Sequence, residues 1–486
     1  MATLATVSID DAYIESAAPN AAAAKNGRGL VLKRKFTSLH RAADDSLLFG
    51  YCAGSGKTPY LCSADFAVPS APVFRCTCPS RQFPCKHALG LLYAFADENS
   101  FSVADVPEEL SSKREKAAAR SEKKKAAADA PRTVNKSALA KKIKAQLDGI
   151  DLLEKLTRDL VRLGIGNMNA KSARELEEQA KQLGNAYLPG AQAALGNYTK
   201  LFYNIDGDEL SAAARESVYS EALDQLSRLH ALIGKGRAYL QGRLADPELA
   251  PETDTPIAAW LGHAWQLREL KDVGLVQENI ELIQLAFNSY DDVARKEFVD
   301  TGLWMNLSTG QIQLTQNFRP YKAVKYIKSD DSFFQIAQIE QLYVYPGDIN
   351  PRIRWEAHLA RAIAPTDLKR VRQHAHQNFA EVIKTVKSTL KAPLADKHPV
   401  FALNFKRIGQ VDTQYVVEDA QGDRLVMTDQ GMYEEPRSAH LISLLPPTLL
   451  ENQTMLVRFR HDLDSRKLQI KPLSIVTNDE VIRLTY

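Results

Sequence analysis

The chain has 486 residues, of which 45% are hydrophobic and 25% charged, as expected for a soluble globular protein of about three domains. No apolar run approaches the ~20 residues that cross a bilayer, and no signal peptide is visible, so we expect a cytoplasmic protein without membrane association. The net charge is only +3, but residues 111–145 hold 12 Lys and Arg against three acids, so the remainder is acidic. The overall charge is therefore no argument for nucleic-acid binding.

Residues 1–104 are predicted to form a small N-terminal domain around a zinc finger at about 47–97. Period-two patterns and turn residues predict a β-hairpin, then a third extended segment and a helix, in a ββα-like arrangement. These elements are expected at 47–53, 60–66, 73–78 and 86–96. The intervening Gly54-Ser-Gly-Lys-Thr58 resembles part of a phosphate-binding loop. However, Tyr51 stands where that motif needs its first glycine and a strand follows, so we interpret it as a hairpin turn.

Residues 105–146 are rich in Ala and Lys and show no apolar stripe before Leu139. Such a segment cannot bury enough surface to offset the entropy of ordering it, which predicts a basic linker, either a solvated single helix or disordered. The alternative is an arm that contacts phosphates by releasing counterions. It contains no aromatic residue that could stack on single-stranded bases.

The rest of the chain predicts three further domains, which makes the fold α+β and multidomain. Residues 147–292 show helical periodicity, including a helix over 260–285. Residues 293–395 combine strands with a helix over 368–390, and residues 396–486 are predicted to be β-rich with hairpins near 419–423 and 462–465.

The five cysteines all lie between positions 52 and 85. Four soft side chains follow the pattern C-x-C-x6-C-x-H: Cys76, Cys78, Cys85 and His87. Three thiols and one imidazole complete a tetrahedral zinc site, and because all four positions are filled by protein we expect one structural, non-catalytic Zn²⁺. The weaker alternative is a set of buried core cysteines beside a helix-capping histidine.

Two further features accompany this pattern. The positive charges of Arg75, Arg81 and Lys86 are expected to surround the site and to favour its thiolates, together with the helix N-terminus. Cys52 and Cys62 lie on the two arms of the predicted hairpin. We interpret them as small core residues, with a second metal or redox pair as the alternative.

The ligand spacing resembles that of the SWIM zinc finger. Residues 54–60 and 78–92 look like the bacterial SWIM zinc finger family proteins of roughly this length, and Leu153–Arg162 is similar to their helical region. The resemblance implies a module that binds DNA or protein, without an assigned enzymatic activity. It also implies, as a partner hypothesis, an association with MoxR-type ATPases and von Willebrand A-domain proteins.

We therefore expect a zinc-binding interaction protein that is not an enzyme. Protein partners are favoured slightly over DNA, because the body outside the basic segment is acidic. We identify no small-molecule substrate, no nucleophile elbow, no H-E-x-x-H and no G-x-G-x-x-G. The alternatives are a subunit of an ATPase-linked assembly without a nucleic-acid role, and an enzyme whose site lies unrecognised within 298–486.

Overall fold

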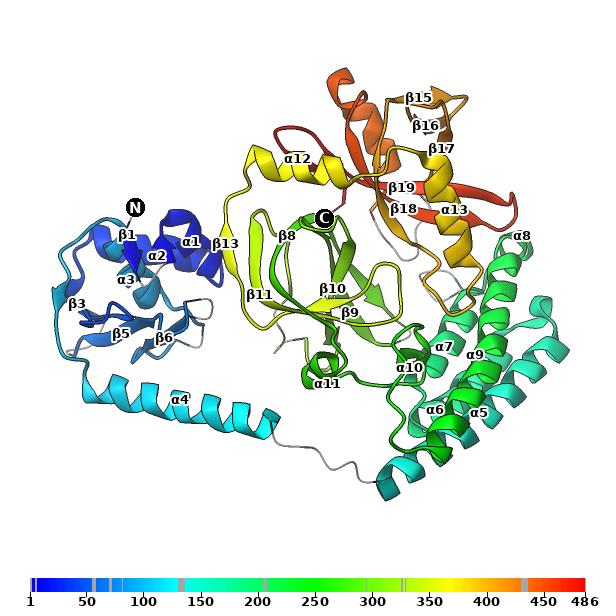
Figure 1. Ribbon diagram of the computed structural model, residues 1–486, viewed down its shortest axis with the longest axis horizontal. Helices are drawn as coiled ribbons and strands as arrows, with labels where there is room; N and C mark the ends of the chain where they lie inside the picture. Colours follow the sequence, from blue (N-terminus) through cyan, green and yellow to red (C-terminus); the bar gives the residue numbers. More distant parts are fainter. Residues whose placement is uncertain are drawn as a thin grey trace. The chain divides into compact units, whose positions relative to one another are not determined.

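The computed structural model combines helices with several β-sheets, which confirms the α+β class (Figure 1). It describes residues 2–4, 7–54, 58–69, 72–80, 82–129, 136–203, 208–293, 295–324, 327, 329–429 and 436–485. Two compact units share the chain: unit 1 is Met1–Pro131 with Ala357–Leu359, and unit 2 is Arg132–Glu356 with Ala360–Tyr486. Among the described residues, no helix has the length and apolar character to cross a membrane.

Unit 1 is built on a five-stranded sheet with the order β6-β5-β4-β3-β7. All pairs are antiparallel except β3 and β7. Its elements in chain order are β1 (Ala2–Leu4), β2 (Val7–Ile9), α1 (Asp11–Ala17), α2 (Ala21–Leu32), β3 (Phe36–Arg41), β4 (Leu47–Cys52), β5 (Tyr60–Asp65), β6 (Val73–Cys76), α3 (Lys86–Ala96), β7 (Ser102–Val103) and α4 (Glu108–Asp129).

Both faces of this sheet are covered, which explains why β4 and β5 read as nearly continuous apolar runs. Successive side chains point to opposite faces of a strand. Leu48, Cys52 and Cys62 pack in one core cluster with residues of α3. Leu47, Phe49 and Leu61 form a second cluster with Leu110 of α4. The sheet therefore lies between α3 on one face and the start of α4 on the other.

Helices α2 and α3 approach each other closely where both carry glycine. A Cβ on Gly27 would lie 3.0 Å from the Cβ of Leu89, and a Cβ on Gly90 would lie 3.1 Å from the carbonyl oxygen of Gly27. Even alanine at either position would push the two helices apart. This contact fixes the position of α3, which carries part of the metal site.

The first turns of α4 are anchored to unit 1 by one apolar side chain and one ion pair. Leu110 is 3% exposed. The Arg114 guanidinium lies 3.2 Å from the buried Asp65 carboxylate and donates to Ser46 Oγ at 2.7 Å. Arg75 also pairs with Asp65, at 3.2 Å. A buried carboxylate such as Asp65 requires a compensating cation, and Arg114 of the basic segment is one of the two arginines that pair with it.

The prediction of a linker over 105–146 differs from the structure at both ends. At the start α4 packs on the sheet, and at the end α5 (Lys136–Leu163) already buries Ile143 and Gln146. The Gln146 amide donates to the carbonyl oxygen of Leu261 at 2.7 Å. A few isolated buried residues hold each end in place. They are too few to form an apolar stripe that can be recognised in the sequence. Residues 130–135, in the middle of the predicted linker, lie outside the described part of the chain.

Unit 2 begins with helices that share one apolar core. Helices α5, α6, α7 and α9 run alongside one another (Figure 1). The elements after α5 are η1 (Ile165–Asn167), α6 (Ala170–Asn185), α7 (Pro189–Lys200), α8 (Ala212–Glu216), α9 (Tyr219–Ala245), α10 (Ile257–Trp260) and α11 (Leu267–Asp272).

Of the predicted helix over 260–285, the structure forms only α11 and Trp260 at the end of α10, so the prediction is wrong for 261–266 and beyond Asp272. Gly274 adopts a φ of +75°, which ends α11, and the chain then enters the long strand β8 (Val276–Asp292). Pairing with strands on both sides outweighs the helical periodicity, because β8 is hydrogen-bonded to β9 and β11. The first strand of the mixed region therefore lies inside the range predicted as helical, 147–292. The domain ranges themselves stay predictions.

The middle sheet of unit 2 has the strand order β10-β9-β8-β11-β12. The predicted helix over 368–390 is divided in two, because Asn378 caps a new helix by accepting from the N–H of Glu381 at 3.2 Å. The elements are β9 (Glu297–Asn306), β10 (Ile312–Pro320), β11 (Ile336–Val344), β12 (Ile353–Arg354), β13 (Leu359–Arg361), α12 (Pro365–His374) and α13 (Phe379–Leu390).

The C-terminal sheet has the order β14-β18-β19-β17-β16-β15, with β20 beside β19. The two strands at the ends of this order, β14 and β15, follow each other along the chain, and residues from across the sheet share one core cluster. Both predicted hairpins are confirmed, as β16–β17 and β18–β19. The elements are β14 (Val400–Asn404), β15 (Arg407–Val411), β16 (Gln414–Glu418), β17 (Arg424–Met427), η2 (Ala439–Leu444), η3 (Pro447–Leu449), β18 (Thr454–Asp462), β19 (Lys467–Val476) and β20 (Val481–Arg483).

A fully buried carboxylate, Asp300, joins several segments of unit 2. Its oxygens accept from Arg319 Nε at 2.8 Å, from Ser289 Oγ at 2.7 Å and from the N–H of Asp330 at 2.9 Å. Burial raises the pKa of Asp300, but the bonds from Arg319, Ser289 and Asp330 outweigh it, so the pKa lies below its ordinary value. The ionised form of Asp300 is thus the form that stabilises the fold.

We predict that Asp300→Asn lowers the free energy of unfolding of unit 2 by about 3–5 kcal/mol at pH 7, because Arg319 loses its counter-charge in a buried site. Since the folded pKa of Asp300 is depressed, this stabilisation is present above the unfolded pKa of about 4 and is lost as the pH falls below it. Urea unfolding at pH 7 and pH 3 measures both effects. Ser289→Ala is the control, with an expected cost near 1 kcal/mol.

Candidate metal centre

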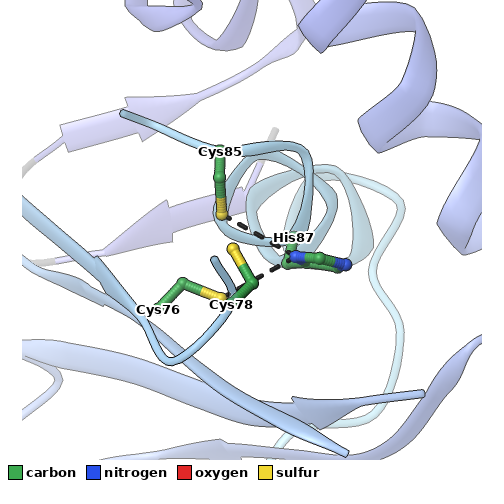
Figure 2. Close-up of side chains that lie close together, drawn as sticks. All are labelled: Cys76, Cys78, Cys85 and His87. Carbon is green, nitrogen blue, oxygen red and sulfur yellow. Dashed lines mark hydrogen bonds between the residues drawn. The ribbon is translucent and has the colours of Figure 1, made fainter. Parts of the chain in front are cut away.

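Two short segments on either side of a loop bring the four predicted ligands together (Figure 2). Cys76 is the last residue of β6 and Cys78 lies in the bend that follows. Cys85 is the N-cap residue of α3, and His87 lies in the first turn of that helix. The sheet therefore positions one pair of ligands and the helix start positions the other.

The spacing of the ligand atoms fits one zinc ion. Nδ1 of His87 lies 3.8 Å from Sγ of Cys76 and 3.9 Å from Sγ of Cys85. The four ligand atoms all lie within 4.8 Å of one another. A tetrahedral Zn²⁺ with Zn–S of about 2.3 Å and Zn–N of about 2.0–2.1 Å separates S from N by roughly 3.6 Å. The cluster is thus positioned to bind a single Zn²⁺ with a small contraction.

Three of the four ligands are buried. Cys78, Cys85 and His87 are buried, whereas Cys76 is only partly buried. The ring of Tyr60 packs on the His87 imidazole with centroids 5.0 Å apart, which helps to hold its orientation. With four protein ligands in a largely water-excluded position, no coordination position is open to a substrate. The arrangement suits a metal that stabilises the fold.

Hydrogen bonds between the thiols set their protonation when no metal is bound. A hydrogen bond with Cys76 lowers the pKa of Cys85 to about 4, and the same bond raises the pKa of Cys76 above its ordinary value. Burial raises the pKa of Cys78. The site then holds one thiolate at neutral pH, while Cys76 and Cys78 must lose protons to bind zinc. Zinc binding therefore weakens as the pH falls.

The expectation that Arg75, Arg81 and Lys86 surround the site is wrong for Arg75. Arg75 is adjacent to Cys76 in a strand, so it points to the opposite face and pairs with Asp65 there. Lys86 is exposed at the start of α3. Arg81 lies outside the described residues. The alternation of β6 thus keeps one predicted cation away from the sulfur atoms.

Cys52 and Cys62 are buried in the core cluster between the sheet and α3. Within the described residues, neither cysteine belongs to a group of side chains that could hold a metal ion. The register nevertheless places Cys62 directly opposite Cys76 on the neighbouring strand. Reasoning from the sequence missed this pairing, because strand register depends on contacts beyond the two strands themselves.

Residues 55–57 of the Gly-Ser-Gly-Lys-Thr segment lie outside the described residues. The strand β5 begins at Tyr60, however, where a phosphate-binding loop would continue into a helix. This agrees with the interpretation that the segment is not such a loop.

A cavity of about 300 Å³ opens beside the metal position. Leu61, Phe74, Phe83 and Leu110 provide apolar walls, and Cys76 lies at its margin. Phe83, from the loop between the ligands, is 47% exposed. The contribution of α4 to this cavity was not predictable from a segment that reads as linker, because it depends on α4 docking against the sheet.

We predict that His87→Ala releases one zinc per chain and unfolds the region around 47–97, while the helices of unit 2 stay folded. Structural zinc contributes an apparent ~10–16 kcal/mol in small zinc fingers, so the remaining contacts cannot compensate. Metal analysis and hydrogen exchange by mass spectrometry measure the two effects. The matched control is Cys52→Ala, which removes a buried thiol outside the ligand set and should keep the metal. A His87→Ala protein that retains one equivalent of zinc would contradict this ligand set.

Comparison with known proteins gives one match. The family model of the SWIM zinc finger matches residues 75–96, a segment that contains all four ligands and the whole of α3. No curated protein and no solved structure matches the chain. The segment 75–96 is thus similar to SWIM zinc fingers in sequence, and its geometry provides a Cys₃His cluster positioned for one Zn²⁺.

Proposed function

We propose that the chain is a zinc-dependent binding protein, not an enzyme, and that unit 1 docks another protein beside its metal centre. The observation that carries the proposal is the closed Cys₃His cluster next to the cavity of about 300 Å³. Because every coordination position is filled by protein, the metal has a structural role and fixes the surface around it. SWIM modules generally serve in binding, which is consistent with this reading.

The chemistry of this surface favours a peptide segment of a protein. Phe83, which lines the cavity, is 47% exposed, and Val73, on the strand that ends at Cys76, is 44% exposed. Charges of both signs, on Arg75, Glu109 and Lys113, line the same cavity. A partner with an apolar anchor and polar flanks fits such a surface better than a uniform polyanion does.

A nucleic-acid role is the second candidate, and an observation in unit 2 favours it. A groove of about 660 Å³ is lined by Lys369, Arg372 and Lys406 together with several amide side chains. Arg372 donates to Gln453 Oε1 and to the carbonyl oxygens of Val476 and Asn452, all neutral acceptors. Burial lowers the pKa of Arg372. Among the described residues no carboxylate pairs with Arg372, and a partly buried cation of this kind is suited to phosphate.

Two further alternatives remain. Membership of an assembly with MoxR-type ATPases and von Willebrand A-domain proteins is implied by the resemblance alone, and co-purification would identify it. A catalytic site within 298–486 would need convergent acids and bases. The groove in that region has cations and amides among its lining residues instead, which supports binding over acid–base chemistry.

We predict that Phe83→Ala weakens the partner's affinity by about 2 kcal/mol, or ~30-fold, while zinc stays bound, because an aromatic anchor is removed without touching a ligand. Proteins that co-purify with the wild type but not with Phe83→Ala are identified by mass spectrometry, and their affinity is then measured with purified components. Val103→Ala is the matched control, since Val103 is 58% exposed in the same unit. If the wild type, Phe83→Ala and Val103→Ala recover the same partner proteins in equal amounts, docking at this surface is contradicted.

The nucleic-acid candidate makes a separate prediction about salt. If the basic segment contacts duplex DNA, replacing Lys123, Lys124 and Lys125 by Ala should reduce the slope of log K against log salt by about 0.9 per lost contact. Fluorescence anisotropy at 50–200 mM salt measures the slope. The control replaces the exposed Lys384, Lys387 and Lys391 at α13. No measurable binding at the lowest salt would exclude this candidate.

A further inference from the structure

We propose that Cys62 is a modification site: it forms a reversible disulfide with Cys76 when a hydroperoxide reaches the metal centre, and the disulfide releases the zinc. The inference does not depend on which partner the protein binds. It rests on the strand register, on the burial of four of the five thiols and on the partial exposure of the fifth, the ligand Cys76.

The register places the two residues within disulfide range. Cys62 and Cys76 are direct partners in the antiparallel pair of β5 and β6. The neighbouring pair is the hydrogen-bonded one, because the N–H of Thr77 donates to the carbonyl oxygen of Leu61 at 3.0 Å. Cys62 and Cys76 therefore form a non-hydrogen-bonded pair, with Cα atoms about 4.5 Å apart and side chains on one face. This lies within the ~4.4–6.8 Å that disulfides span.

The same register excludes a disulfide between Cys62 and Cys52. Cys52 lies opposite Tyr60, and Cys62 lies opposite Gly50, so Cys52 and Cys62 are diagonal neighbours across β4 and β5. Diagonal Cα atoms lie about 7–8 Å apart, beyond the ~7 Å limit for a disulfide without backbone movement. Cys52 and Cys62 lie in the same core cluster and on the same face of the sheet. Only Cys62 lies directly opposite Cys76, so Cys52 is a matched control.

Exposure determines which sulfur reacts first. Cys76 is the one ligand of the four that is not buried, and it lines the cavity of about 300 Å³ beside Phe83. Cys62 has no exposed surface. A small oxidant can therefore enter through the cavity and attack Cys76, while Cys62 stays reduced as the thiol that resolves the product.

The chemistry balances with hydrogen peroxide as the oxidant. Its O–O bond breaks as one oxygen, with its hydrogen, is transferred to the thiolate Sγ of Cys76, giving a sulfenic acid, and the other oxygen leaves as hydroxide, which takes a proton from the solvent to become water. Sγ of Cys62 then attacks this sulfur, the S–S bond forms, the S–O bond breaks and a second water leaves. One thiolate, one thiol, one peroxide and one proton from the solvent thus give one disulfide and two waters. Three ligands remain, so zinc is held less tightly and dissociates.

The experiment uses the full chain, with its zinc content measured beforehand. It is treated with hydrogen peroxide, alkylated with iodoacetamide and digested with trypsin. Cleavage after Lys57, Arg75, Arg81 and Lys86 places Cys62 in peptide 58–75, Cys76 and Cys78 in 76–81, and Cys85 in 82–86. We expect 58–75 linked to 76–81, about one zinc released per link, and recovery of zinc binding after dithiothreitol and added zinc.

Two variants test whether Cys62 is the residue that forms the disulfide. Cys52→Ala should form the link as the wild type does, and Cys62→Ala should not form it. The proposal is overturned if wild-type Cys62 is recovered fully alkylated while zinc is lost, or if the oxidised product links 76–81 to 82–86 or closes within 76–81. The wild-type peptides give this result even if Cys62→Ala folds poorly. A protein without zinc at the start would refute the metal site instead, which separates the two failures.

Discussion

The convergence of three sulfur atoms and one imidazole within 4.8 Å is the constraint on which unit 1 depends. Thiols this close compete for protons, as the opposite pKa shifts of Cys76 and Cys85 show. A divalent cation removes the competition by accepting all three thiolates and the neutral imidazole together. Zinc thereby links the end of a strand to the start of a helix across a loop that has little apolar burial of its own.

This link extends into the basic segment through the sheet. Cys76 and Arg75 are neighbours on β6, one facing the metal position and the other facing Asp65. Asp65 also holds Arg114 of α4, and Leu110 completes the contact. The orientation of the first turns of the basic helix is thus tied to the strand that carries the first ligand.

Unit 2 is organised on a different principle. Its helices and sheets bury large apolar clusters, and its buried charges are compensated by protein groups, as at Asp300. A unit of this size can be stabilised by apolar burial. Unit 1, with the smaller core, uses a metal for the part of its fold that apolar contacts do not hold.

The ligand set was predictable from the sequence, because four soft side chains within twelve positions form a local pattern that leaves few alternatives. The hairpins at 419–423 and 462–465 were predictable for the same local reason. The strand β8, the docking of Leu110 and Arg114, and the break between α12 and α13 were not. In each case pairing or burial against residues distant in the sequence outweighed the local preference. The sequence by itself therefore determined the chemistry of the metal site. Only the tertiary structure decided which thiol lies opposite Cys76, because strand register depends on contacts over the whole sheet.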